Sequence, residues 1–319
     1  MDTDSIKKKH GLLYPVGCIL KIGEHKLMLK RTVKKHLVSY LLISPAAAFL
    51  ILFVFYPIVY SVVLSTQRYR LGFKTREFIG FENYQVLFQA SDFWNSLRIT
   101  AVYTVFVVVI SIVLGLFIAI LISQRKKTGM AWQIVFFLPV AATMAAMAVV
   151  WRFILDDNFG FFNNLLRYFG RTGSDWLRNP ETALGSVIMI NIWANAGYAM
   201  VFFIAGLANI PDELYQAASL DGSNRIQNFR YISWPLLSPT TLFITIIMTV
   251  RALASFDTIK VMTNGGPVSS TQILSLLLYQ EAFQFFNIGY ASSIAVVFFI
   301  LVLALALVQM KFDARVHYT

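Results

Sequence analysis

Residues 99–124 read ITAVYTVFVVVISIVLGLFIAILISQ, a run of 26 residues without Asp, Glu, Lys or Arg. About 20 apolar residues in helical form cross the hydrocarbon core of a bilayer. The run lacks the strict alternation of a barrel strand, and a helix satisfies its own backbone hydrogen bonds in lipid. This stretch therefore predicts a transmembrane helix and places the chain among membrane proteins.

Five other charge-free runs are also long enough to span. They cover residues 37–67, 128–151, 182–211, 231–250 and 282–310. The chain is 57% hydrophobic and 13% charged, whereas a soluble domain averages about 45–50% apolar and about 25% charged residues. We therefore predict an all-α, polytopic membrane protein with six transmembrane helices. The predicted spans are about 37–65, 99–123, 131–154, 183–208, 232–256 and 288–310.

Basic residues predict the orientation. Residues 1–36 carry nine of the 27 Lys and Arg residues, and basic flanks stay in the cytoplasm. Six spans then place both termini inside, with sixteen basic residues in cytoplasmic segments and nine in external ones. This orientation explains the net charge of +11. We expect no nucleic-acid partner, because no basic patch is interleaved with exposed aromatic residues.

The predicted domain organisation has three parts. Residues 1–36 form a basic cytoplasmic extension. Its apolar stretch at residues 11–20 is too short to span and suits either an interfacial helix on anionic lipid or a flexible tail. Residues 37–311 form the membrane domain, with a cytoplasmic loop at 209–231, and residues 312–319 form a cytoplasmic tail.

Residues that would carry catalysis are missing from the predicted spans. His10, His25, His36 and His317 lie near the termini, and Cys18 is the only cysteine. No Lys directly follows a Gly, so the chain lacks a Walker A sequence. We therefore expect no enzyme, no metal site and no cofactor bound by this chain, and a conduit or transporter remains.

The loop between predicted spans four and five reads NIPDELYQAASLDG at residues 209–222. Pro211 suits the first turn of a helix, and the acidic pair Asp212-Glu213 opposes the positive end of the helix dipole. Gly222 suits a helix stop with positive φ. We expect a short helix, a bend, and a second short helix from Ser223 to about Tyr231. The small residues between Pro211 and Gly222, including Ala217 and Ala218, suit docking of the first helix into a groove on another protein, or its contact with lipid.

A family pattern runs through this loop. It resembles the EAA loop of ABC-importer permeases, in which this helix couples the permease to a cytoplasmic ATPase. Gln216 stands where the family pattern has Glu. The matching residues are Gln216, Ala217, Ala218, Asp221, Gly222, Phe229, Ile232 and Pro235. On this resemblance we assign ATPase coupling to Glu213, Gln216, Ala217, Ala218, Asp221 and Gly222.

A second pattern narrows the family to its sugar-type members. Phe256-Asp257 followed by Thr263-Asn264-Gly265-Gly266-Pro267 resembles their FD…T-x-GGP signature, and the resemblance covers about residues 40–311. Gly265, Gly266 and Pro267 suit a rigid turn in an external loop. This turn could contact a solute-binding protein, or it could only shape the loop.

The resemblance implies a type I ABC-importer permease fold and a sugar or oligosaccharide substrate. The implied partners are a second homologous permease chain, two ATPase subunits that hold ATP and Mg, a periplasmic or lipid-anchored solute-binding protein, and the lipid bilayer. The implied location is the bacterial inner membrane. The alternative is a stand-alone ion-coupled carrier or channel. It would need an acidic residue at mid-membrane, and predicted spans two to six have none at their centres.

Polar residues inside spans mark the expected substrate pathway, because they are costly in lipid. Asn191, Asn195 and Tyr198 are spaced to share one face of a helix, and Trp193 lies between them. Hydrogen bonding between helices is the alternative role for the two asparagines. These four residues are candidates for contact with a sugar.

Two arginines lie in or beside spans. Arg251 lies twenty residues after Tyr231, which predicts a place near the external end of span five. It is a fifth pathway candidate and favours tolerance of an acidic substrate, but it could instead pair with Asp257 or with a partner chain. Arg152 has Asp156 four residues later and predicts an interfacial ion pair.

Overall fold

The structure is a computed structural model that describes residues 40–72, 76–124 and 129–313. The predicted extension at 1–36, the four histidines and Cys18 lie outside these residues, as does most of the predicted tail. The chain divides into two units, residues 1–60 and 61–319. In the first unit, residues 40–60 are helical, with a π-helical turn η1 (Ile51–Phe55).

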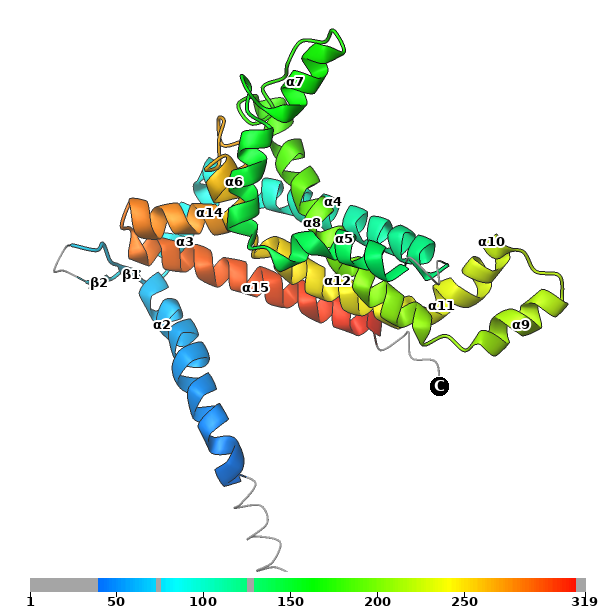
Figure 1. Cartoon of the computed structure of the whole chain (residues 1–319). Coiled ribbons are helices and arrows are strands. Elements are labelled where there is room, and N and C mark those ends of the chain that lie inside the picture. Colours follow the sequence, from blue (N-terminus) through cyan, green and yellow to red (C-terminus); the bar gives the residue numbers. More distant parts are fainter. Residues whose placement is uncertain (1–39, 73–75, 125–128, 314–319) are drawn as a thin grey trace, which may run out of the picture. The chain divides into compact units, whose positions relative to one another are not determined.

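Helices make up nearly all of the described chain (Figure 1). After η1 come α2 (Tyr56–Ser65), strands β1 (Gln67–Arg68) and β2 (Glu77–Phe78), α3 (Glu82–Gln89), α4 (Ser91–Ser123), α5 (Gly129–Ala141), α6 (Met144–Ile154), α7 (Phe161–Tyr168) and α8 (Pro180–Ala208). Then follow α9 (Asp212–Leu220), α10 (Arg225–Asn228), η2 (Phe229–Ser233), α11 (Trp234–Leu236), α12 (Ser238–Leu253), α13 (Asp257–Met262), α14 (Leu274–Tyr279), η3 (Gln280–Gln284) and α15 (Ile288–Asp313). The two strands pair antiparallel, Gln67 with Phe78 and Arg68 with Glu77.

Five stretches within the described residues are long and apolar enough to cross a membrane. They are Tyr40–Ser65, Ser91–Ser123, Pro180–Ala208, Ser238–Met262 and Ile288–Lys311. Helices α5 and α6 pass the same test only together and are bent by 97° at their junction. Counted as one broken span, this pair brings the total to six and confirms the predicted helical membrane fold.

Helix ends follow capping chemistry as well as hydrophobicity. Helix α4 begins at Ser91, before the charge-free run, since a helix continues beyond the hydrocarbon into the polar layer. Helix α8 begins after Asn179, whose side-chain oxygen accepts the Glu181 N–H at 3.0 Å, and Pro180 occupies the first helical position. Charge-free runs therefore locate these spans, but they underestimate the lengths of the helices.

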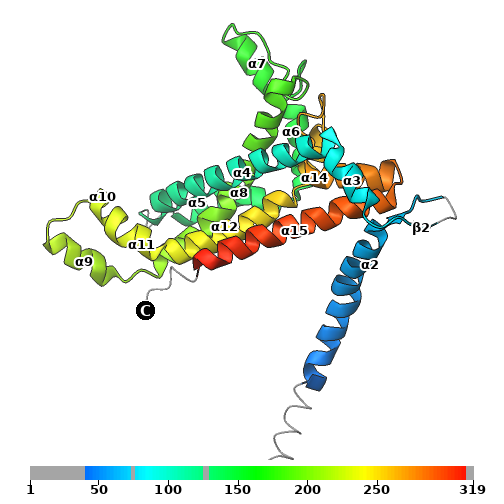
Figure 2. The same cartoon turned by 180° about the vertical axis from the view of Figure 1, so that it is seen from behind.

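Helices α4 and α8 form the centre of the second unit, α12 packs against both, and α15 packs against α12 (Figures 1 and 2). Gly115 of α4 permits a close approach: a Cβ placed there would lie 2.5 Å from the Cβ of Ala199 on α8. Small residues at such crossings let helix backbones pack tightly in a membrane. Tyr103, Met200 and Phe203 are fully buried along the same contact.

Two of the six spans are broken. Between α5 and α6, Thr143 caps the second helix by accepting the Ala146 N–H at 3.4 Å. Between α12 and α13, residues 254–256 leave the helix although none of them is Gly or Pro. At this second break, the hydroxyl of Tyr103 on α4 donates to Ser255 Oγ at 2.8 Å. The break at residues 254–256 thus coincides with a contact from another helix, and the local sequence does not predict it.

Candidate functional site

A cavity of about 210 Å³ lies where the two broken spans meet α4 and α8. It is lined by Tyr103, Met144, Asn191, Asn195, Arg251, Ala252, Ala254, Ser255, Phe256, Asp257 and Thr258. Seven of these eleven residues lie at or beside the α12–α13 break. Discontinuous helices expose backbone polar groups within a membrane, and in transporters they form substrate sites near the midplane.

The two asparagines predicted for the substrate pathway both line this cavity. Asn191 Nδ2 donates to Val187 O at 2.9 Å, and Asn195 Nδ2 donates to Asn191 O at 2.8 Å. Both bonds stay within α8 and do not join it to another helix. Asn191 is buried in the chain and Asn195 is half-buried.

Arg251 also lines the cavity, and it lies in the last turn of α12, just before the break. The apolar stretch counted from Ser238 to Met262 includes α13, so the helical segment continues beyond Arg251. Its place near the external end of the span stays a prediction. The Arg251 Cζ atom lies 4.6 Å from the centre of the Tyr198 ring. Among the described residues, no carboxylate, including that of Asp257, lies within 4.0 Å of its guanidinium.

The other two predicted pathway residues lie outside the cavity lining. Tyr198 lies beside the site, with its ring against the guanidinium of Arg251. Trp193 lies on a different face of α8 and packs edge-on against Trp151, with ring centres 5.4 Å apart. Sequence reasoning missed Tyr103 and Ser255, although a tyrosine inside an apolar span was a usable signal for the first.

The helix α9 carries the predicted coupling residues. It begins after Pro211, which caps the helix and does not enter it. It ends in a Schellman motif: Gly222 has φ +78°, its N–H donates to Ser219 O at 3.1 Å, and the Ser223 N–H donates to Ala218 O at 3.0 Å. The predicted helix stop at Gly222 is confirmed. The second helix, α10, starts two residues later than predicted, behind an Asn224–Gln227 capping box.

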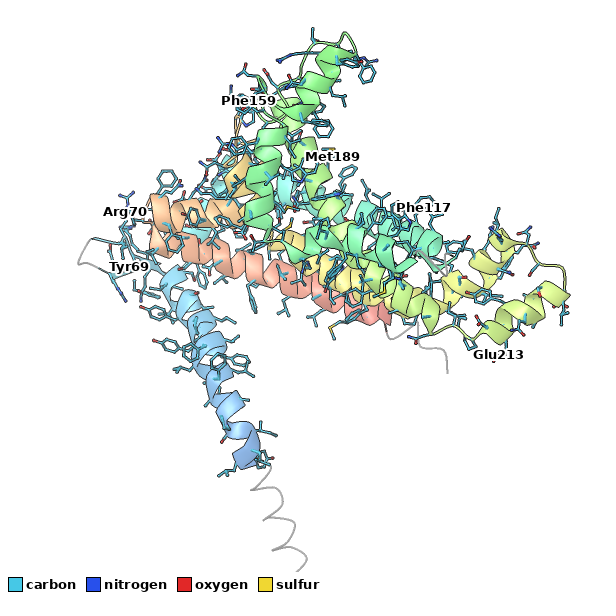
Figure 3. The ribbon with its side chains drawn as sticks, in the orientation of Figure 1. Tyr69, Arg70, Phe117, Phe159, Met189 and Glu213 are labelled. Carbon is cyan, nitrogen blue, oxygen red and sulfur yellow. The ribbon has the colours of Figure 1, made fainter. Side chains whose placement is uncertain are left out.

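No residue of α9 is buried within the chain. Glu213, Gln216, Ala217 and Leu220 are exposed at helical spacing along one face, and Glu213 is labelled in Figure 3. The hydroxyl of Tyr215, on another face, shares a hydrogen bond of 2.9 Å with Ser233 Oγ on η2. Helix α9 is therefore tied to the bundle on one side and presents an exposed stripe on the other. The stripe contains Glu213, Gln216 and Ala217 of the predicted coupling residues and adds Leu220, whereas the predicted Ala218 is half-buried. Asp221 and Gly222 are exposed as well.

The predicted contact turn, Gly265-Gly266-Pro267, is stabilised mainly by contacts inside its own loop. Gly265 is buried with φ +88°, and the Thr271 hydroxyl donates to Gly266 O at 2.8 Å. Pro267 and Gly266 are half-buried. Val268, which sequence reasoning did not single out, follows the turn and is 88% exposed. The turn thus shapes a loop that presents an exposed apolar side chain directly after it.

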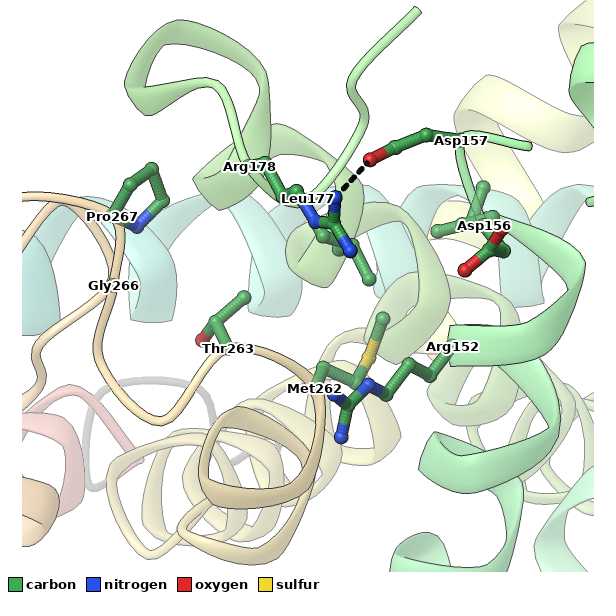
Figure 4. Close-up of a pocket in the computed structure, with 10 residues that line it drawn as sticks. Arg152, Asp156, Asp157, Leu177, Arg178, Met262, Thr263, Gly266 and Pro267 are labelled. Atoms are coloured by element: carbon green, nitrogen blue, oxygen red, sulfur yellow. Dashed lines mark ion pairs between the residues drawn. The ribbon is translucent and has the colours of Figure 1, made fainter.

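A second cavity, of about 330 Å³, adjoins this turn (Figure 4). It is lined by Arg152, Leu155, Asp156, Asp157, Leu177, Arg178, Met262, Thr263, Gly266 and Pro267. An ion pair of 3.2 Å joins Arg178 to Asp157, which is largely shielded from solvent. Burial raises the pKa of Asp157, Asp175 adds to the rise, and Arg178 opposes it.

The predicted ion pair between Arg152 and Asp156 does not form within the described residues. Helix α6 ends at Ile154, so the two residues do not share a helix. The four-residue spacing therefore does not bring their side chains together on one helix face. Asp156 Oδ1 accepts the N–H groups of Asn158 and Phe159 at 2.9 and 3.3 Å. The carboxylate thus organises the loop that leads into α7.

Residues 111–318 match the family described as "binding-protein-dependent transport system inner membrane component". The match covers more than half of the chain. The chain therefore belongs to this family of membrane permease components.

Curated relatives resemble it along most of their length. "Probable ABC transporter permease protein YurN" of Bacillus subtilis is 37% identical over 86% of this chain and 96% of the relative. "Sulfoquinovosyl glycerol transport system permease protein SmoG" of Agrobacterium fabrum is 31% identical over 86% and 90%. A chain of the bacterial alginate ABC transporter, solved in complex with an alginate pentasaccharide-bound periplasmic protein, superposes with a TM-score of 0.81. That chain is 21% identical over 91% of this chain and 98% of its own length, and it shows a common fold.

Proposed function

We propose that this chain is a transmembrane subunit of a binding-protein-dependent ABC importer that moves a sugar or oligosaccharide across the bacterial inner membrane. One observation carries the proposal: a cavity lined in part by polar side chains, at two broken spans, and an exposed helix with a coupling pattern occur in one chain. Asn191 and Asn195 supply amides for sugar hydroxyls. Membership of the permease family and the sugar-type relative support the substrate class.

The mechanism that we propose is alternating access driven from outside the chain. Two ATPase subunits hold ATP and Mg and close on each other, and the exposed stripe of α9 transmits their movement to the spans around the cavity. A second homologous permease chain completes the pathway. A periplasmic or lipid-anchored binding protein delivers the sugar at the end of the molecule that carries Val268. Both termini lie in the cytoplasm in this arrangement. Transport requires that loaded binding protein and ATP favour different conformers.

The test is purification of the tagged chain from its native membrane, followed by reconstitution into vesicles. We expect an ATPase and a second permease chain to co-purify, and sugar uptake to require ATP and the binding protein. Specific sugar flux through the chain alone, without ATP, would identify a stand-alone carrier or channel and contradict the proposal.

A further inference from the structure

Arg251 is a basic side chain within an apolar span, and its place there needs a reason. A charge in the centre of a membrane is costly and is kept where it faces a cavity or a partner. Arg251 lines the 210 Å³ cavity, and no described carboxylate lies within 4.0 Å of it. Its described contact is with the face of the Tyr198 ring, at 4.6 Å. The positive charge is therefore oriented but not neutralised by the described residues.

The Tyr198 ring that carries Arg251 is itself held in position. It packs against Phe202 with ring centres 5.0 Å apart, and Phe202 packs against Phe243 of α12 at 5.7 Å. A guanidinium that stacks on a ring uses its face, so its N–H donors, which lie in its plane, stay available. No hydrogen bond from Arg251 is recorded to any described residue. These donors match the two oxygens of a carboxylate.

We propose that Arg251 is a specificity-determining residue that selects a saccharide bearing a carboxylate, such as a uronic acid. The inference rests on the proposed sugar-import function and assigns the substrate class of the same cavity. The guanidinium edge binds the carboxylate, while Asn191 and Asn195 on the facing helix bind hydroxyls of the sugar ring. The Tyr198 ring keeps the guanidinium in place, so less rotamer freedom is lost on binding.

Asp257 is the competing partner, since it lines the same cavity. A structural Arg251–Asp257 pair would make both residues dependent on each other. A selective role for Arg251 predicts the opposite: neutralising Asp257 removes a repulsive charge and leaves uptake of an acidic saccharide intact. The single substitution Asp257→Asn therefore separates the two roles.

The experiment uses the host that encodes the chain, with the gene deleted and then restored as wild type, Arg251→Gln, Arg251→Lys, Asp257→Asn or Arg98→Gln. Arg98 is exposed on α4 and lines no cavity described above, so Arg98→Gln is the matched loss of charge. The probe is a mixture of acidic and neutral oligosaccharides from partly hydrolysed pectin, glucuronoxylan and starch. Mass spectrometry follows which species each strain removes from the medium. Co-purification of the ATPase checks that each variant assembles.

We expect wild type to remove species that contain a uronic acid and the deletion strain to leave them. Arg251→Gln should slow their removal by about tenfold or more, since a bidentate ion pair is lost. Arg251→Lys should keep part of the rate, and Arg98→Gln all of it. If Arg251→Gln fails to assemble, the comparison of Arg251→Lys with Arg98→Gln decides.

Removal of neutral species alone by wild type would overturn the inference and leave sugar import standing. Undiminished removal of acidic species by assembled Arg251→Gln would also overturn it. So would loss of acidic uptake in assembled Asp257→Asn, because a structural pair makes each residue dependent on the other. If wild type removed nothing that the deletion strain leaves, the proposed import function and this inference would fall together.

Discussion

Asn191 on α8 is 2% exposed and hydrogen-bonded to its own helix, whereas α9, which begins four residues after α8 ends, buries no residue within the chain. The cavity beside α8 is built from four spans of this chain, so its geometry is largely complete in the chain alone. The exposed stripe on α9 is folded in this chain, but the residues that it would contact belong to a partner. A buried polar group acquires its role from its neighbours, while an exposed helix face acquires one from a partner. Substitutions should therefore fail in different ways in these two regions.

The largest expected effect is at the end of α9. Gly222→Pro cannot adopt the φ of +78° at this position, because proline holds φ near −65°. We expect uptake to be lost and ATP hydrolysis to become independent of substrate, while the chain still inserts. Uptake assays and ATPase assays on reconstituted complex measure both. Gly222→Asn is the matched control, since Asn tolerates this conformation. Normal transport by Gly222→Pro would remove α9 from the coupling pathway.

The next effect concerns folding on the α8 side of the comparison. Gly115→Ala forces a methyl group against Ala199 and should lower the stability of the complex by about 1–3 kcal/mol. Gly185→Ala on α8 meets nothing within 4 Å and should be neutral or stabilising by up to about 1 kcal/mol. Thermal unfolding of the purified complex compares the two. Equal shifts would mean that the α4–α8 crossing is looser than described.

A smaller effect should follow from a change in the cavity itself. Asn195→Leu removes a polar group that lines it, and a typical net hydrogen bond of about 0.5–1.5 kcal/mol predicts a drop in uptake of a few-fold to about tenfold. The complex should still assemble with its ATPase. Met189→Leu, at an exposed position of the same helix (Figure 3), should transport normally. Unchanged uptake by Asn195→Leu would assign Asn195 to packing.

The smallest effect on stability is expected on the exposed stripe of α9. Leu220 is 90% exposed, so Leu220→Ser should change the stability of the chain by no more than about 0.5 kcal/mol. It should nevertheless reduce the ATPase that co-purifies, because its contacts belong to the partner. Phe78→Ser, which alters another apolar and largely exposed residue, on β2, should leave that ATPase in place. A stability loss in Leu220→Ser without ATPase loss would reverse the contrast between the two regions.

Residue patterns predicted several features of these regions well. The α9 helix and its stop at Gly222 followed from the acidic first turn and a terminal glycine, which are local interactions. The position of Asn191 and Asn195 on one face of α8 followed from their spacing. Arg152 and Asp156 show where such reasoning fails, since their four-residue spacing assumes a helix that ends at Ile154. The break that follows Arg251 and the continuation into α13 could not be predicted either, because nothing local marks them.

Hydrophobic runs alone settled that this chain is a helical membrane protein, because lipid leaves the backbone no hydrogen-bonding partner except itself. The same runs could not place the break at residues 254–256, which contain no helix breaker, or set Arg251 against Tyr198. Those features depend on Tyr103 reaching Ser255 from α4 and on aromatic packing between α8 and α12. Contacts between segments distant in the chain have no local signature, so the cavity and its charge emerged only once the helices were packed together.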